Sequence, residues 1–180
     1  KQGMTIWASS MEDAWFGTIV DRIYVATHFH KRLLCGRREV PSRKVLVTGF
    51  PLYPDFVIHK IKKEKVIVFP HRLDTEKCPE LFIRLSQEPI LQKWHFVRTK
   101  DMDLTKEEYY QVLCQADIAI SFSMQETWGI AMQESTLCGA IPFVPNRLSY
   151  PELYLNSFLY SSYDDLVQGI VNSHQARMDL

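Results

Sequence analysis

Short apolar runs alternate along this chain with longer segments in which apolar residues recur at helical spacing. The runs are short and rich in Val, Ile, Phe and Tyr, which is typical of β-strands. The run at residues 65–69 is apolar after its first residue, as expected for a strand buried on both faces of a parallel sheet. The predicted strands cover residues 22–26, 44–48, 65–69, 94–97, 118–122, 141–144 and 158–160.

The segments between these runs carry the signals of helix ends. Pro79 suits the first turn of a helix, Thr105 with Glu108 has the capping-box pattern, and Gly139 stands where a helix should stop. The predicted helices cover residues 28–34, 79–86, 106–116, 128–137, 150–155 and 163 onward. This alternation predicts an α/β fold, a Rossmann-like parallel sheet with helices on both faces.

Ligands of such sheets bind outside the carboxyl ends of the strands, so functional residues are expected directly after strands. The first such loop, residues 70–77, contains Arg72 and Lys77. A planar guanidinium and an ammonium together suit a diphosphate. The simpler interpretation of this loop alone is an ion pair of Arg72 or Lys77 with Asp74 or Glu76 on an exposed turn.

The second loop follows the predicted strand at 118–122 and leads into a helix. Gly129 opens this helix, so backbone N–H groups can approach an anion or a sugar hydroxyl there. Glu126 precedes it and Glu134 lies within it, and a carboxylate is a natural acceptor for the vicinal hydroxyls of a ribose or a hexose. Alternatively, Glu126 is a helix-start acid favoured by the helix dipole and Glu134 a helix-surface acid.

Composition narrows the class of protein. The chain has 180 residues, 46% of them apolar, which suits one domain with a full core. It has no apolar stretch long enough to cross a membrane and no signal-peptide pattern, so a cytoplasmic protein is expected. Its four cysteines lack metal-ligand spacing and are expected as buried free thiols in a reducing compartment. They are Cys35, Cys78, Cys114 and Cys138.

Charge is unevenly distributed although the formal net charge is zero. Ten basic and three acidic residues lie between Lys31 and Lys65, an excess of +7. Such a basic stretch indicates either a surface for a polyanion or a solvated basic face, and charge alone favours the second.

Residues 126–142 resemble the signature of glycosyltransferase family 4 and its relatives. The shared pattern is a Glu, an aromatic-Gly-aliphatic triplet, a second Glu after seven intervening residues, a small-Cys-Gly segment and an apolar strand with Pro. Arg72 and Lys77 match the paired basic residues of that family. The resemblance runs from about Asp21 to the end of the chain. The phrases most similar to the tRNA-queuosine mannosyltransferase type, which modifies a base in RNA, are residues 69–72, 110–117, 129–134 and 148–152.

The resemblance implies the C-terminal, donor-binding domain of a GT-B glycosyltransferase that retains anomeric configuration and uses neither metal nor other cofactor. The donor would be a nucleoside-diphosphate sugar. Arg72 and Lys77 would bind its diphosphate, Glu134 the ribose and Glu126 the transferred sugar. The implied catalytic residues are Arg72, Lys77 and Glu126. The implied donor-binding residues are Arg72, Lys77, Glu126, Thr127, Trp128, Gly129, Ile130 and Glu134.

The same resemblance predicts the domain organisation. Residues 1–20 would be a remnant or linker of a missing acceptor-binding N-terminal domain, and residues 21–180 the donor-binding domain, inactive by itself. The chain departs from the family pattern at His71 and Thr127, where Gly is common. The stretch from Pro89 to Thr105 is short, and within it Thr99–Met102 are expected to line the base pocket.

Two other functions are a non-catalytic binding module and a dehydrogenase. A Rossmann-like module could bind nucleotide or nucleic acid without catalysis, and convergence of Arg72, Lys77, Glu126 and Glu134 on one cleft would argue against it. The acceptor stays open among nucleic acid, glycan, protein and small molecule, and the basic stretch together with the resemblance favours a nucleic-acid base. A dehydrogenase is disfavoured because no Gly-x-Gly-x-x-Gly follows a strand. The Asp-x-Asp at residues 101–103 is interpreted as a turn and cap rather than a metal site.

Overall fold

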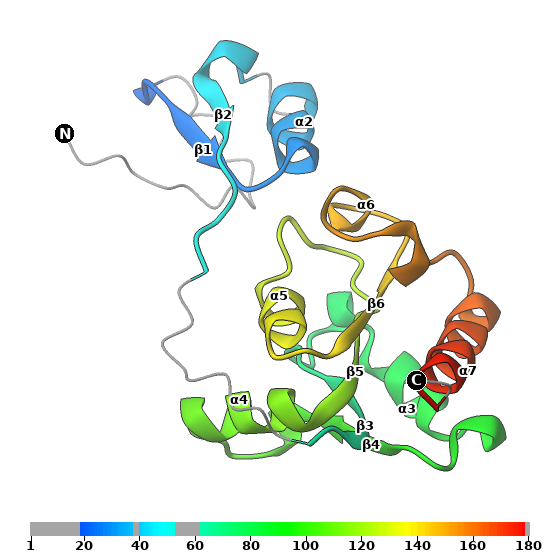
Figure 1. Ribbon diagram of the computed structural model, residues 1–180. Coiled ribbons are helices and arrows are strands. Elements are labelled where there is room, and N and C mark those ends of the chain that lie inside the picture. Colours follow the sequence, from blue (N-terminus) through cyan, green and yellow to red (C-terminus); the bar gives the residue numbers. More distant parts are fainter. Residues whose placement is uncertain (1–18, 38–39, 53–61, 179–180) are drawn as a thin grey trace. The chain divides into compact units, whose positions relative to one another are not determined.

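The computed structural model describes residues 19–37, 40–52 and 62–178 (Figure 1). The chain divides into two units, residues 1–51 and 52–180. In the smaller unit, β1 (Ile23–Val25) and β2 (Val45–Val47) form a parallel two-stranded sheet joined through α2 (His28–Arg37). Its core is made by buried aliphatic residues of all three elements and the loop between them, namely Ile23, Val25, Leu34, Val40 and Val45.

The larger unit contains a parallel five-stranded sheet with the strand order β4-β3-β5-β6-β7. All neighbouring strands pair in parallel, which confirms the predicted Rossmann-like arrangement. β1 and β2 pair with each other and are not strands of this sheet. The strands are β3 (Glu64–Phe69), β4 (His95–Arg98), β5 (Ala116–Ile120), β6 (Ile141–Pro145) and β7 (Leu159–Tyr160).

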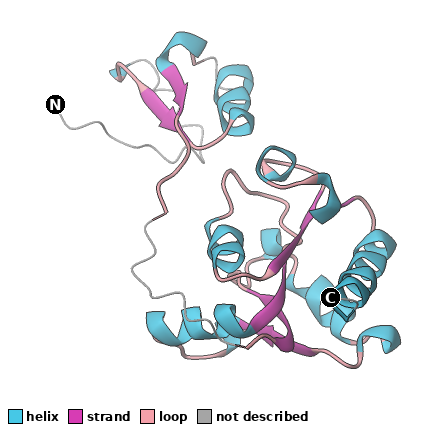
Figure 2. Cartoon of the chain, in the orientation of Figure 1, coloured by secondary structure: helices cyan, strands magenta, loops and turns pink. Residues whose placement is uncertain are grey.

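Helices cover both faces of the larger sheet (Figure 2). One apolar cluster joins the sheet to α3 and α7, and a second joins its other face to α4, α5 and α6. The central strands β3 and β5 are apolar toward both clusters, as buried parallel strands should be. The helices are α3 (Pro79–Ser86), α4 (Lys106–Gln115), α5 (Ile130–Leu137), α6 (Tyr150–Leu153) and α7 (Tyr163–Met178).

Local sequence signals explain where several helices begin and end. Pro79 occupies the first turn of α3, and Thr105 and Glu108 form the complete predicted capping box of α4. Several boundaries differ from the prediction, and two of them have a local cause. β5 starts at Ala116 instead of residue 118, because the backbone becomes extended directly after α4. α5 starts at Ile130 instead of Trp128, because Gly129 has a φ of 77°, which a helix cannot contain.

The strand order places a topological switch point between β3 and β5. The chain leaves β3 toward β4 on one side and later returns to β5 on the other side of β3. The loops that follow the parallel strands β3 and β5 both start at the carboxyl ends of these strands, where ligands of doubly wound sheets bind. Both loops singled out from the sequence therefore lie on the same edge of the sheet, as predicted.

Two expectations from composition can be compared with the described residues. None of the helices in the described part of the chain is long and apolar enough to cross a bilayer. All four cysteines are free thiols; Cys114 and Cys138 are buried, whereas Cys35 and Cys78 are partly exposed.

Candidate functional site

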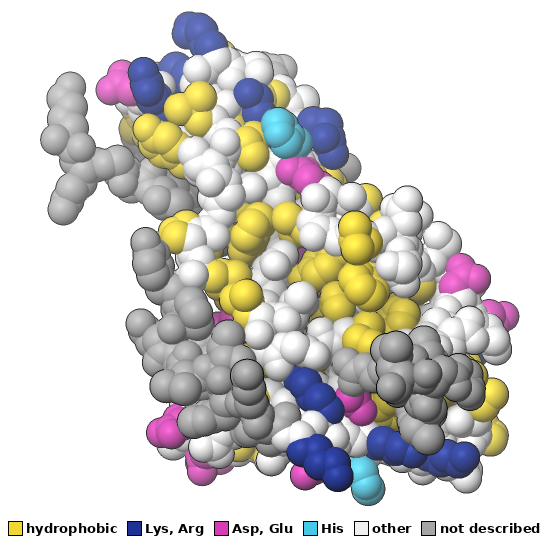
Figure 3. All heavy atoms as spheres, in the orientation of Figure 1, with side chains coloured by type: hydrophobic (Ala, Val, Ile, Leu, Met, Phe, Trp, Pro, Cys, Tyr) yellow, Lys and Arg dark blue, Asp and Glu magenta, His cyan; other side chains and the backbone are white. Residues whose placement is uncertain are grey.

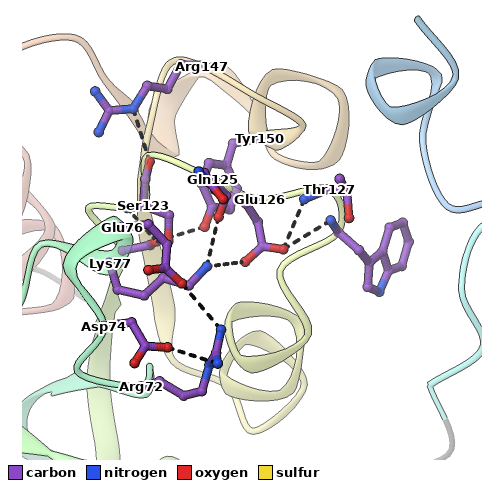
Figure 4. Close-up of polar contacts among 12 residues, drawn as sticks. Arg72, Asp74, Glu76, Lys77, Ser123, Gln125, Glu126, Thr127, Arg147 and Tyr150 are labelled. Atoms are coloured by element: carbon purple, nitrogen blue, oxygen red, sulfur yellow. Dashed lines mark hydrogen bonds and ion pairs between the residues drawn. The ribbon is translucent and has the colours of Figure 1, made fainter. Parts of the chain in front are cut away.

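An ion pair between Lys77 and Glu126 joins the two loops at the switch point. Lys77 follows β3 and Glu126 follows β5, and Lys77 Nζ lies 3.2 Å from Glu126 Oε2. Their side chains are only 10% and 18% exposed. Lys77 Nζ also donates to the carbonyl of Gln125 at 2.8 Å, so this ammonium holds the loop after β5 at two points (Figure 4).

The carboxylate of Glu126 is held from its other side by the backbone. Its Oε1 accepts hydrogen bonds from the N–H groups of Thr127 at 3.0 Å and Trp128 at 3.3 Å. Burial alone would raise the pKa of Glu126, but Lys77 and the backbone N–H groups outweigh it and lower that pKa. Glu126 is therefore a fixed carboxylate at neutral pH.

Arg72 lies on the exposed side of the same site. Its guanidinium is 2.9 Å from Asp74 Oδ2 and 3.3 Å from Glu76 Oε1, and its side chain is 68% exposed. The structure thus contains the ion pairs of the simpler interpretation, and Figure 4 shows Arg72 pointing toward both acids. Such exposed pairs are weak, so Arg72 can exchange them for a stronger anion.

A cavity of about 300 Å³ opens beside Arg72 at the carboxyl ends of β3 and β4. Its volume is at the lower end of small-molecule sites. Thr99, Lys100 and Met102, all within the segment predicted to form the base pocket, contribute to its wall. The cavity is lined by Pro70, His71, Arg72, Thr99, Lys100, Met102, Leu104, Thr105, Lys106 and Tyr109.

Glu134 is held by two phenols from α4. Its Oε1 accepts a hydrogen bond from Tyr110 at 2.7 Å and its Oε2 accepts one from Tyr109 at 3.1 Å. Burial, with Glu134 nearby, raises the pKa of Tyr109, which keeps this phenol protonated as a donor. Tyr109 also lines the cavity, so it connects Glu134 to the space next to Arg72.

Gly129 joins the loop of Glu126 to α5 in a conformation that few other residues adopt. Its φ is 77°, and an added Cβ would lie 3.3 Å from Cε1 of Tyr150 and 3.5 Å from Cγ of Glu126. Ile130 is the first residue of α5 and is 38% exposed. The backbone at Gly129 therefore packs closely on residues of the site.

Sequence reasoning missed a polar network beneath the loop after β5. Tyr150 and Ser121 share a hydrogen bond of 2.7 Å, and Ser121 and Ser123 share another of 3.0 Å. Arg147 donates to the carbonyls of Ser123 at 3.1 Å and Phe122 at 2.8 Å. Because Arg147 closely follows β6, the rule that placed Arg72 after β3 could have identified it. No comparable sequence pattern identifies the hydroxyl groups of Ser121, Ser123 and Tyr150.

Two other expectations concern charge. Asp101 accepts a 2.6 Å hydrogen bond from Arg98, and Thr105 caps α4, so Asp101 belongs to a turn but not to the cap. The described residues contain no cluster of His, Cys, Asp or Glu that could hold a metal ion. Part of the basic stretch, including Arg38 and Lys60, lies outside the described residues, and Lys63 donates to the carbonyls of Ala116 and Cys138. In Figure 3, basic side chains of the larger unit lie beside acidic ones.

Comparison with known proteins finds similarity in sequence to a mannosyltransferase. The chain is 28% identical, over 174 residues, to the tRNA-queuosine alpha-mannosyltransferase of Drosophila melanogaster. The match covers 75% of this chain and 46% of the fly enzyme. No model of a known protein family matches the chain.

Solved structures of similar shape include glycosyltransferases. Staphylococcus aureus TarM, in a complex with UDP, superposes with a TM-score of 0.65 at 13% identity, covering 88% of this chain and 37% of TarM. Anabaena HepE with UDP and glucose gives a TM-score of 0.65 at 14% identity over 90% of this chain and 57% of HepE. The pneumococcal O-GlcNAc transferase GtfA gives 0.63 at 15% identity over 92% and 39%.

These comparisons confirm the resemblance inferred from the sequence. The chain has the Rossmann-like fold of the GT-B glycosyltransferases and is similar in sequence to the tRNA-queuosine mannosyltransferase. It spans about half the length of that fly relative.

Proposed function

We propose that this chain binds a nucleoside-diphosphate sugar and forms the donor-binding part of a retaining glycosyltransferase. The observation that carries the proposal is the ion pair of Lys77 with Glu126 at the switch point, close to Arg72, which lines the cavity. A base in the cavity, a diphosphate at Arg72 and Lys77, and a sugar toward Glu126 would follow one another along this edge of the sheet. By themselves, the 180 residues are expected to bind the donor without completing transfer.

The free acceptor positions of the two glutamates support their different roles. A carboxylate has about four lone-pair sites. Glu134 accepts one hydrogen bond on each oxygen, which leaves one site per oxygen for the two hydroxyls of a ribose. Glu126 already accepts two on Oε1 and one on Oε2 and is also held by the backbone N–H of Gly129, so it has less acceptor capacity left than Glu134.

The cations suit the chemistry of the leaving group. When the bond between the sugar and the diphosphate breaks, negative charge grows on the diphosphate, and fixed cations stabilise that charge most in the transition state. Lys77 is held at a defined place by its buried contacts. Arg72 adds a planar fork that can bind two phosphate oxygens.

A nucleic-acid base as acceptor is a further part of the proposal. The similarity to an enzyme named for tRNA-queuosine supports it, as does the +7 excess between Lys31 and Lys65. The basic residues would contact the phosphates of the RNA, and these contacts add affinity without reading sequence.

Calorimetric titration with UDP, GDP, ADP and their hexose derivatives tests the proposal. We expect at least one nucleoside diphosphate to bind, and Arg72→Ala to weaken it about tenfold through loss of a charged hydrogen bond. Lys93→Ala is the matched control, because Lys93 is exposed and precedes β4 at the opposite end of that strand. The proposal is wrong if none of these ligands binds, or if the two variants bind equally well.

A further inference from the structure

His71 is a buried imidazole at the carboxyl end of β3. It is 5% exposed and lines the cavity next to Arg72. Its Nε2 is buried and lacks a hydrogen-bond partner among the described residues. Buried polar atoms nearly always have a hydrogen-bond partner, so we expect a bound ligand to supply the partner of this nitrogen.

The ring of His71 is fixed in orientation by the core. It packs edge-on against Phe69, with the ring centroids 5.1 Å apart and an interplanar angle of 66°. Phe69 is fully buried and packs in turn on Phe82 and Phe122. The imidazole is thus held in place before any ligand arrives, as binding sites require for affinity.

Its surroundings also fix its charge. Burial and the nearby Lys77 lower the pKa of His71 to about 3, and Glu126 opposes them only in part. The imidazole is therefore neutral at physiological pH, and a neutral imidazole carries one N–H donor. Because the charges of both Lys77 and Glu126 act on His71, His71 lies near these two residues. This is the end of the site where the diphosphate would meet the sugar.

We infer that His71 is a further donor-binding residue, whose Nε2–H donates a hydrogen bond to a diphosphate oxygen of the nucleotide sugar. This inference rests on the proposed function. A diphosphate oxygen is an acceptor only, so it complements an N–H that has no partner among the described residues. The neutral imidazole adds a hydrogen bond beside Lys77 without the repulsion that another buried cation would bring.

The test compares nucleoside diphosphates with nucleosides. The 180-residue chain is titrated with UDP and GDP and with uridine and guanosine, as wild type and as His71→Ala and His71→Gln. His95→Gln is the matched control, because His95 is exposed at the start of β4. We expect His71→Ala to weaken the bound diphosphate about tenfold and to leave the affinity for its nucleoside unchanged. His71→Gln, which keeps an N–H donor, should retain part of the affinity.

A second measurement does not depend on the variants folding. In wild type, the imidazole ¹⁵N resonances of His71 should shift on addition of the diphosphate and stay in place with the nucleoside. The inference is overturned if Arg72→Ala weakens the diphosphate while His71→Ala does not, or if nucleoside and diphosphate weaken equally in His71→Ala. Absence of any resonance shift also overturns it. If wild type binds neither UDP nor GDP nor any other ligand of the first titration, the proposed function falls together with this inference.

Discussion

At the scale of single residues, the pair of Lys77 and Glu126 distinguishes this site from an ordinary charged surface. Both side chains are largely buried, so loss of one partner leaves the other charge without compensation. The neighbouring ion pairs of Arg72 are exposed instead. The two cations therefore serve the same proposed diphosphate but differ in what they contribute to the folded state.

Lys77→Met should destabilise the protein by about 3 kcal/mol, because Glu126 then stays buried without its cation. Arg72→Ala, the matched control, should change stability by less than about 1 kcal/mol, since exposed ion pairs contribute little. Urea unfolding measures both, and the double variant Lys77→Met/Glu126→Gln should recover part of the loss. Equal effects of Lys77→Met and Arg72→Ala would show that the buried pair does not stabilise the loops.

His71 gives the molecule a stability that depends on pH. In the unfolded chain an imidazole binds a proton below a pKa of about 6.5, whereas in the folded protein the pKa of His71 is lowered to about 3. Stability is therefore lost as the pH falls from about 6.5 toward about 3, and His71 contributes little pH dependence above about 6.5. Between about pH 7 and pH 5, wild type should lose about 2 kcal/mol more than His71→Gln in urea unfolding. Parallel losses in the two proteins would contradict the buried, neutral imidazole.

At the scale of elements, the junction between β5 and α5 depends on Gly129. Gly129→Ala should cost about 1 to 3 kcal/mol, because a side chain at φ 77° is strained and its Cβ would press on Tyr150. Gly36→Ala is the control, because Gly36 lies in α2 with no atom within 4 Å of an added Cβ. We expect it to stabilise its helix by about 0.5 to 1 kcal/mol. Thermal unfolding that ranks the two variants equally would exclude a special role for this glycine.

Elements were predictable where the signal is local. The capping box of α4 and the Pro at the start of α3 are set by neighbouring residues, and both were predicted at their observed positions. The sheet to which a strand belongs is not local. β1 and β2 are apolar runs like β3. The spacing of apolar residues along a strand does not determine which strand it pairs with, so the separate sheet of β1 and β2 was not predicted.

The site was predictable to the same extent. Arg72 and Glu126 could be placed on one edge because both follow parallel strands. The pairing of Lys77 with Glu126 spans 49 residues of sequence and depends on side-chain geometry. The phenols that hold Glu134 and the burial of His71 likewise result from packing between elements, which the sequence pattern does not reveal.

At the scale of the whole molecule, the chain spans 46% of its fly relative. Of all parts of the proposal, the acceptor is the one that the residues of the described site support least directly. We predict that the basic stretch adds salt-sensitive affinity for RNA. Replacing the exposed residues Arg32, Arg43, Lys62 and Lys65 by Ala should weaken tRNA binding. It should also reduce the slope of log affinity against log salt by about 0.7 to 0.9 for each RNA phosphate that the variant no longer neutralises.

The control for this prediction replaces exposed lysines outside the stretch, Lys93 and Lys106, and should leave the slope unchanged. Fluorescence anisotropy with labelled tRNA, between low and physiological salt, measures the affinity and this slope. Affinity that does not change with salt in the wild-type chain would refute a polyanion-binding role for the basic stretch.

The central claim, that this edge of the sheet binds a nucleotide sugar in a fixed order, is tested most directly by calorimetric titration of Glu134→Ala and Glu126→Ala. Each variant is titrated with UDP and GDP and with UDP-glucose and GDP-mannose, and Glu107→Ala, an exposed acid in the first turn of α4, is the control. Glu134→Ala should weaken the bare diphosphate and its sugar derivative alike, by about tenfold. Glu126→Ala should bind the bare diphosphate as wild type does and lose affinity only for the nucleotide sugar. If both variants bind all four ligands as the control does, the two glutamates do not contact the donor and the donor-site assignment is wrong.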